Sequence, residues 1–264
     1  MAQSPFEIKK EICDVGKRIY DHGFVAANDG NISVKVGPNE FYCTPTGVSK
    51  GYMTPDMIIR IDGQGNKIDG KLNPSSEIKM HMRVYQERPD AGAVVHAHPP
   101  VATAFTVAGI AMDQFILPEA ILTIGSVPTC DYGTPSTMEI PDSLMPYIQK
   151  HDAFLLKNHG ALTVGNTLMR ACFTMEEVEF NAKINLYARQ LGVGAEAHIE
   201  RSPASSWRSS WSCVRRWGCP VSIPAARSAR TAARPTAAAC PRTTRLRTPA
   251  AAAARRLPFP ATMT

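Results

Sequence analysis

Apolar residues recur at helical and at strand spacings along the first 200 residues, and this pattern predicts most of the secondary structure. Between Pro5 and His22 they return every three or four residues, which is typical of an amphipathic helix. Between Asn31 and Val36 they alternate with polar residues, as in a half-buried strand. The same criteria predict strands at 40–43, 57–62, 93–98, 127–130 and 153–156, and helices at 78–87, 101–108 and 167–191.

The order of these elements predicts the fold class. Several predicted strands are joined by Pro and Gly turns and are mixed with helices, with a hairpin turn at 63–66. A serine or Asn73 is predicted to cap the helix at 78–87. We therefore expect a three-layer α/β/α fold around a central, mainly antiparallel sheet.

The charge of the chain changes sign near residue 200. The whole sequence carries 29 Lys and Arg against 23 Asp and Glu, a net charge of +6. Twelve of the Arg lie in residues 201–264, which contain no Lys, Asp or Glu, so residues 1–200 have a net charge of −6. The net positive charge of the whole chain therefore does not indicate a nucleic-acid partner for the first 200 residues.

Residues 201–264 are predicted to form a low-complexity tail. The segment is rich in Arg, Ala, Pro, Ser and Thr, and no helical or strand period persists through it. Three interpretations compete: a disordered basic arm that binds polyanions, a linker, and a stretch translated out of frame. The complete loss of both acids and Lys favours the last. We predict one folded domain at 1–200 and assign no function to the tail.

No membrane span or secretory signal is predicted. No apolar run approaches the 18 or more residues of a membrane helix, and the N-terminal residues lack the apolar stretch of a signal peptide. We therefore expect a cytoplasmic protein without a membrane partner. Widely spaced cysteines in a domain of this size indicate buried, reduced thiols. They are Cys13, Cys43, Cys130 and Cys172.

Two histidines at alternate positions of a predicted strand are the sharpest candidates for metal ligands. His96 and His98 point to the same face of the strand, and two imidazoles so spaced can chelate one divalent metal. The same spacing also occurs where each ring only satisfies local hydrogen bonds. His159, before a glycine turn, and Glu77, at the start of a predicted helix, are further candidates. His81, one turn from Glu77, is a rival that we interpret as a packed or solvated residue.

Three short segments have the features of an anion site. The stretches 29–31 and 44–47 are tight turns whose backbone N–H groups can face a ligand. A pair of serines precedes a helix, where free N–H donors favour phosphate. Each segment also has an ordinary role as a turn or a helix cap. The candidate residues are Gly30, Asn31, Thr46, Gly47, Ser75 and Ser76.

Taken in order, these motifs resemble the class II aldolase/adducin family over residues 6–197. Chance agreement of five ordered motifs is far less expected than agreement of one. The motifs are Gly30-Asn31-Ile32-Ser33, Thr44-Pro45-Thr46-Gly47, Gly70-Lys71 through Ser75-Ser76-Glu77, Val94-Val95-His96-Ala97-His98 and Asn158-His159-Gly160. The resemblance implies a Zn²⁺ site formed by the three histidines with Glu77 close to the metal. It also implies a sugar phosphate whose phosphate group lies against the six anion-site residues.

The function implied by this resemblance is zinc-dependent aldol cleavage. The substrate would be a ketose 1-phosphate such as L-fuculose 1-phosphate, and the products dihydroxyacetone phosphate and an aldehyde. Glu77 would transfer a proton to and from the substrate carbon at which the carbon–carbon bond breaks. The epimerases of the family typically carry Asp at this position, which favours an aldolase. An L-ribulose-5-phosphate 4-epimerase-like enzyme and a non-catalytic adducin-like module are the alternatives. The implied assembly is a homotetramer with sites between subunits.

One group expected from the resemblance is missing. The aldolases resembled use a tyrosine from a neighbouring subunit to protonate the aldehyde oxygen, and the corresponding stretch 113–119 contains no tyrosine. Glu119 and Tyr132 are candidate substitutes, although each also suits an ordinary structural role. The family's C-terminal segment, which closes over the site, is replaced here by the tail. Substrate identity is therefore more open than the metal chemistry.

Overall fold

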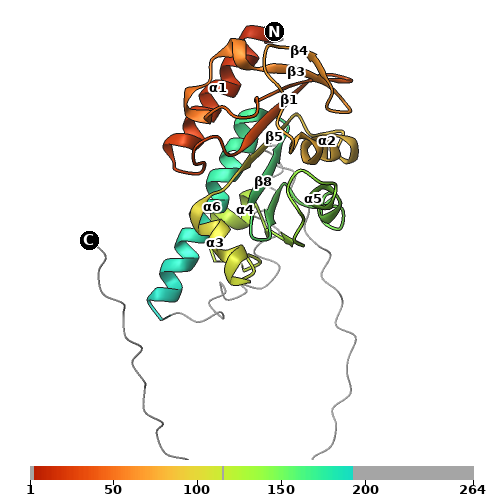
Figure 1. The fold of residues 1–264 in the computed structure, drawn as a ribbon. Helices are drawn as coiled ribbons and strands as arrows, with labels where there is room; N and C mark the ends of the chain where they lie inside the picture. Colours follow the sequence, from red (N-terminus) through yellow and green to blue (C-terminus); the bar gives the residue numbers. More distant parts are fainter. Residues whose placement is uncertain (1–2, 115, 193–264) are drawn as a thin grey trace, which may run out of the picture. The chain divides into compact units, whose positions relative to one another are not determined.

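The computed structural model describes residues 3–114 and 116–192, so the predicted tail at 201–264 lies outside the described residues (Figure 1). Eight strands form one sheet in the order β4-β3-β2-β1-β5-β8-β7-β6. Every pair of neighbouring strands is antiparallel except β6 and β7, which are parallel. The sheet is thus mainly antiparallel, as predicted.

The described elements have the following bounds. The strands are β1 (Asn31–Gly37), β2 (Glu40–Cys43), β3 (Ile59–Asp62), β4 (Lys67–Asp69), β5 (Ala93–Ala97), β6 (Thr129–Cys130), β7 (Ala153–Leu156) and β8 (Gly160–Gly165). The helices are α1 (Pro5–Asp21), α2 (Ile78–Glu87), α3 (Pro100–Ala108), α4 (Pro118–Thr123), α5 (Glu139–Ser143) and α6 (Leu168–Gln190). Two short 3₁₀ helices, η1 (Lys50–Tyr52) and η2 (Pro55–Met57), connect β2 to β3.

The predicted elements are confirmed to within a few residues, and six elements were missed. The missed elements are the strands β4 and β8, the α-helices α4 and α5, and the short 3₁₀ helices η1 and η2. All six residues of β8 are buried, so it lacks the alternation that marks a half-exposed strand. The predicted cap of α2 was wrong. Glu77 occupies the N-cap position, and the Ser75 hydroxyl accepts a hydrogen bond from the Glu77 N–H instead of capping the helix.

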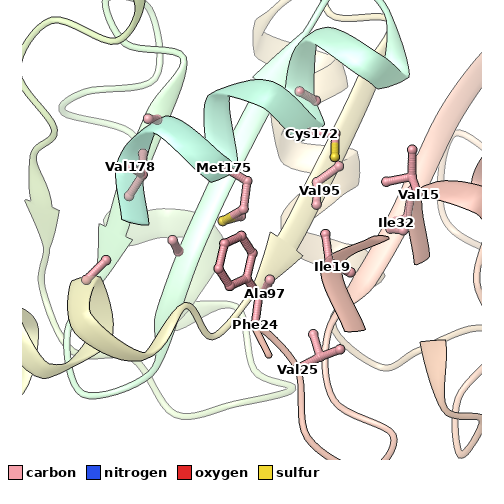
Figure 2. Close-up of a cluster of buried hydrophobic side chains, with 14 of the residues drawn as sticks. Val15, Ile19, Phe24, Val25, Ile32, Val95, Ala97, Cys172, Met175 and Val178 are labelled. Carbon is pink, nitrogen blue, oxygen red and sulfur yellow. The ribbon is translucent and has the colours of Figure 1, made fainter. Parts of the chain in front are cut away.

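Helices cover both faces of the sheet. On one face, α1, α3 and α6 pack over a cluster of apolar side chains that includes Ile19, Val95 and Met175 (Figure 2). Burying one such side chain contributes about 1.5–3 kcal/mol. On the other face, α2 and α5 pack over a second cluster that includes Val94 and Phe154. Because alternate residues of β5 face opposite layers, His96 points to the same side as Val94.

Local signals in the sequence explain how α1 is placed. Ser4 caps the helix by accepting a hydrogen bond from the Glu7 N–H, and the Glu7 carboxylate accepts one from the Ser4 N–H. The buried stripe of α1 includes Ile12, Val15 and Ile19. This stripe packs onto the sheet. In the segment that follows the helix, the Phe24 carbonyl accepts a hydrogen bond of 2.8 Å from the His98 N–H, just after β5.

The cysteines and the membrane prediction can be compared with the described residues. Cys43, Cys130 and Cys172 are buried and Cys13 is half-buried, and all four are free thiols. Burial raises the pKa of the Cys43 thiol to about 12. Within the described ranges, none of the helices combines the length and the apolar character needed to cross a bilayer.

Candidate active site

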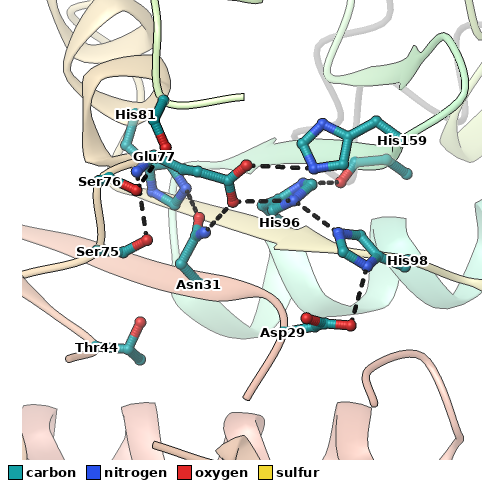
Figure 3. Close-up of polar contacts among 12 residues, drawn as sticks. Asp29, Asn31, Thr44, Ser75, Ser76, Glu77, His81, His96, His98 and His159 are labelled. Atoms are coloured by element: carbon teal, nitrogen blue, oxygen red, sulfur yellow. Dashed lines mark hydrogen bonds and ion pairs between the residues drawn. The ribbon is translucent and has the colours of Figure 1, made fainter. Parts of the chain in front are cut away.

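Three histidines from two segments meet at the end of β5. His96 is a buried residue of β5, His98 follows the end of this strand, and His159 lies in the turn between β7 and β8. One ring nitrogen from each lies within 4.8 Å of the other two, and the Nε2 atoms of His96 and His98 are 3.1 Å apart (Figure 3). Pairing of β5 with β8 brings the turn of His159 to the His96-x-His98 segment. The three predicted ligands therefore converge.

The backbone around His159 explains the local sequence Asn-His-Gly. A Cβ atom on Gly160 would lie 2.5 Å from the Ala97 carbonyl oxygen and 2.6 Å from the His98 ring, so only glycine fits there. Asn158 has a φ of 56°, in the left-handed region that asparagine tolerates. Its N–H donates to the Thr106 hydroxyl over 3.0 Å. The turn is thus held against both β5 and α3.

Outer contacts orient two of the imidazole rings. The Nδ1 atom of His96 lies 2.9 Å from the Ala161 carbonyl oxygen, so Nδ1 carries the proton and Nε2 presents a lone pair. The Nδ1 atom of His98 lies 3.5 Å from an Asp29 carboxylate oxygen, which favours the same tautomer. Burial lowers the pKa of both His96 and His98, and neutral imidazole is the form that binds metal. This donor set fits a divalent cation such as Zn²⁺.

Glu77 lies at the edge of the histidine cluster. Its Oε1 atom is 3.2 Å from His159 Nε2, and its Oε2 atom is 3.5 Å from His96 Nε2. The Asn31 amide donates a hydrogen bond of 2.9 Å to Oε2. Burial alone would raise the pKa of the Glu77 carboxyl, but the hydrogen bonds with His159 and Asn31 lower it. An ionised carboxylate is therefore held next to the three imidazoles, of which His96 and His98 are neutral.

The predicted anion-site residues come from segments that lie side by side. The Thr46 N–H donates to the Asn73 carbonyl over 2.9 Å, and Pro45 forms a β-bridge with Pro74. These contacts place the turn of Thr46 and Gly47 beside the start of α2, where Ser75 and Ser76 lie. Anion binding by these segments stays a prediction.

The individual anion-site residues differ in their surroundings. Gly30 has a φ of 75°, and a Cβ atom there would lie 2.9 Å from the His96 carbonyl oxygen. Thr46, Gly47 and Ser76 are not buried, and the Ser76 hydroxyl contacts the Ser136 hydroxyl over 2.7 Å. Asn31 is buried, and its side chain is occupied by Glu77 and His81 (Figure 3).

Sequence reasoning undervalued three residues near this site. His81 is fully buried, as its interpretation as a packed residue allowed, but it also bonds to Asn31 and Ser33. Asp29 was seen only as part of a turn, whereas its carboxylate faces His98. Lys50 is buried, and its ammonium donates to the carbonyls of residues 28 and 48. The spacing of residues 77 and 81 was a visible signal for His81, whereas the sequence around Lys50, the first residue of η1, carries no comparable signal.

Proteins of known class resemble this chain over most of the described residues. Residues 10–186 match the family model of the Class II Aldolase and Adducin N-terminal domain. The chain is 34% identical over 184 residues to an L-fuculose phosphate aldolase of Methanococcus maripaludis, which covers 69% of this chain and 97% of the relative. It is 30% identical over 181 residues to a 3-oxo-tetronate 4-phosphate decarboxylase of Haemophilus influenzae, covering 67% of this chain and 85% of the relative.

A solved structure also resembles this chain. The crystal structure of L-fuculose-1-phosphate aldolase from Thermus thermophilus is 31% identical, with a TM-score of 0.64. The match covers 71% of this chain and 97% of that chain. The fold is therefore shared with a solved L-fuculose-1-phosphate aldolase.

Proposed function

Because this chain belongs to the class II aldolase and adducin family, we propose that it is a metal-dependent lyase acting on a small sugar phosphate. The bond broken would be a carbon–carbon bond next to a carbonyl group. The observation that carries this proposal is the convergence of three imidazoles beside the ionised Glu77 carboxylate. A purely structural protein has no need for such a buried, oriented donor set.

We propose that His96, His98 and His159 hold Zn²⁺. When bound, the ion supplies Lewis-acid stabilisation of the negative charge that develops on the substrate oxygens during bond cleavage. The histidines keep this charge undiminished because they are neutral ligands. The carbonyl of Ala161 and the carboxylate of Asp29 hold two of the rings in the ligating orientation.

Glu77 is the proposed acid–base group. Its carboxylate is ionised and mostly buried, with 17% of the side chain exposed, so it can accept a proton from substrate and return one to carbon. Asn31 holds Oε2 of this carboxylate by a hydrogen bond. The proposed phosphate cradle consists of the turn at Thr46 and Gly47, the segment at Gly30 and Asn31, and the serines before α2. Backbone N–H groups there would orient the substrate relative to Glu77.

The first candidate reaction is aldol cleavage of a ketose 1-phosphate. L-Fuculose 1-phosphate or a similar compound would give dihydroxyacetone phosphate and an aldehyde, reversibly. The curated relatives named L-fuculose phosphate aldolase, at 30–34% identity, support this choice. An epimerase would share the bond-breaking step and differ in rebinding the aldehyde, so its products would distinguish it. A non-catalytic module would bind neither metal nor phosphate.

The second candidate reaction is decarboxylation of a 3-oxo acid phosphate, and the missing tyrosine favours it. Aldol cleavage requires a proton transfer at the oxygen of the departing aldehyde. In decarboxylation the substrate carboxylate departs as CO₂, and no proton is transferred at the departing group. Residues 113–119 contain no tyrosine. The candidate substitutes are exposed: Glu119 lies on α4, and Tyr132 is 59% exposed. Relatives named 3-oxo-tetronate 4-phosphate decarboxylase also resemble the chain.

The proposal is tested with the full chain, by metal analysis and two parallel assays. One assay follows dihydroxyacetone phosphate from L-fuculose 1-phosphate, and the other follows CO₂ from 3-oxo-tetronate 4-phosphate. We expect bound zinc, activity in one assay, and a loss of kcat of about 10²–10⁴ in Glu77→Gln with zinc retained. The control is Glu40→Gln, the same change at an exposed residue of β2. A wild type without metal, or full activity in Glu77→Gln, would refute the proposal.

The assembly and location are also proposals. From the family resemblance we infer a homotetramer with sites between subunits and a cytoplasmic enzyme without nucleic-acid or membrane partners. Sedimentation velocity of the full chain measures the first, since a homotetramer has four times the monomer mass of 28.7 kDa.

A further inference from the structure

A chain of buried hydrogen bonds runs from Glu77 into the contact between β1 and α2. Residues 31 and 33 lie on one face of β1, and residues 77, 81 and 85 recur one helical turn apart along α2. The bonds join Glu77 to Asn31 (2.9 Å), Asn31 to His81 (2.5 Å), His81 to Ser33 (2.7 Å) and Ser33 to Tyr85 (2.9 Å). Figure 3 shows the part that connects His81 and Asn31 to Glu77.

The direction of each bond follows from the ionised carboxylate. Glu77 Oε2 can only accept, so the Asn31 Nδ2 atom faces it and donates. The Asn31 Oδ1 atom then faces His81 Nε2, which must carry a proton to donate to it. Burial lowers the pKa of His81 to about 3, although the Glu77 charge opposes this shift, so the ring is neutral. His81 Nδ1 therefore accepts from the Ser33 hydroxyl.

The end of the hydrogen-bond chain away from Glu77 fixes the orientation of the His81 ring. The Tyr85 hydroxyl lies 3.0 Å from the Ser33 carbonyl oxygen and 2.9 Å from the Ser33 hydroxyl. Asn31, Ser33 and His81 are each at most 2% exposed, so water cannot replace these partners. A reversed Asn31 amide would place Oδ1 against the Glu77 carboxylate and Nδ2 against the His81 N–H. Both contacts would then be unfavourable, which leaves one orientation.

We propose that His81 is a positioning residue for the lyase reaction: through its Nε2–H it fixes the Asn31 amide, which in turn holds the Glu77 carboxylate beside His96 and His159. This inference rests on the proposed function. It assigns the Asn31 side chain to Glu77, whereas the family resemblance implied contact with the substrate phosphate. The two roles predict different kinetics, because orienting the proton-transfer group changes kcat and binding the phosphate changes KM.

Three variants of the full chain separate these roles. His81→Phe keeps a ring but removes the donor, and His81→Gln supplies an amide donor in its place. Val84→Ala is the matched control, because Val84 is fully buried on α2 and belongs to the apolar cluster on that face. We expect His81→Phe to lower kcat about 10–100-fold with little change in KM. His81→Gln should recover most of this loss, and Val84→Ala should keep the wild-type kcat.

A readout independent of activity is the protonation of the His81 ring. Long-range ¹H–¹⁵N NMR of the wild type at neutral pH should show a protonated Nε2 and an unprotonated Nδ1. The side-chain amide signals of Asn31 should shift in both His81→Phe and Glu77→Gln, and not in Val84→Ala. If His81→Phe fails to fold, the tautomer of wild-type His81 and the Asn31 shift in Glu77→Gln still test the positioning role.

The outcomes are distinct. An unchanged kcat in His81→Phe, an effect confined to KM, or a Gln variant as slow as the Phe variant would overturn the positioning role. So would an Nδ1–H tautomer or a charged ring in the wild type. An inactive wild type that nevertheless shows the expected tautomer and Asn31 shifts would overturn the proposed reaction while supporting the geometry of the hydrogen-bond chain.

Discussion

Acidification should destabilise this protein through His81, by an amount that can be worked out from its surroundings. Burial lowers the pKa of His81 from an ordinary value of 6.5 to about 3. The folded pKa is thus the lower one, and between these two values the unfolded chain binds a proton that the folded chain does not. The contribution of neutral His81 to the free energy of unfolding is therefore fully present above pH 6.5 and is lost as the pH falls. From pH 7 to pH 5 the loss from this one residue is about 2 kcal/mol.

His81→Gln removes this titration and so provides the measurement. Urea unfolding of both full-length proteins is followed at pH 7 and pH 5 by far-UV circular dichroism, with a chelator present so that metal release does not contribute. Circular dichroism is preferred to tryptophan fluorescence because all three tryptophans lie outside the described residues, at positions 207, 211 and 217. We expect the difference in unfolding free energy, wild type minus variant, to fall by about 2 kcal/mol. A difference that stays constant would show that folded His81 takes up a proton as readily as it does in the unfolded chain, which would refute the reasoning.

Two further predictions concern Gly160, the first residue of β8, and the buried Lys50 of η1. Gly160→Ala should weaken zinc binding at least tenfold and destabilise the fold by about 1–3 kcal/mol, because the new Cβ overlaps the Ala97 carbonyl and the His98 ring. Titration with zinc should show normal affinity in Gly109→Ala, where φ is 67° but the space around a new Cβ atom is open. Burial lowers the pKa of Lys50 to about 8, so wild-type stability relative to Lys50→Met should rise between pH 8 and pH 10. A flat difference in melting temperature would contradict this.

Much of the site was predictable because its residues lie at the ends of strongly patterned elements. The strand predicted at 93–98 placed His96 and His98 on one face, and the two rings do meet in the structure, although β5 ends at Ala97. The glycine after His159 indicated a turn, and the turn is there. The strand at 160–165 could not be predicted by alternation, because β8 is central and buried on both faces. Its pairing with β5 is what carries His159 to the other two histidines.

The sequence by itself determined the element pattern, the separate character of residues 201–264 and the identity of the metal-ligand candidates. These follow from local periodicity and composition, which each stretch of chain carries alone. Only the tertiary structure decided what Asn31 and His81 do. Strand positions repeat every two residues and helix positions every three to four, so which strand side chain meets which helix side chain depends on how α2 packs on β1. That packing aligns residues 31 and 33 with residues 77, 81 and 85, and turns two ordinary buried side chains into a support for Glu77.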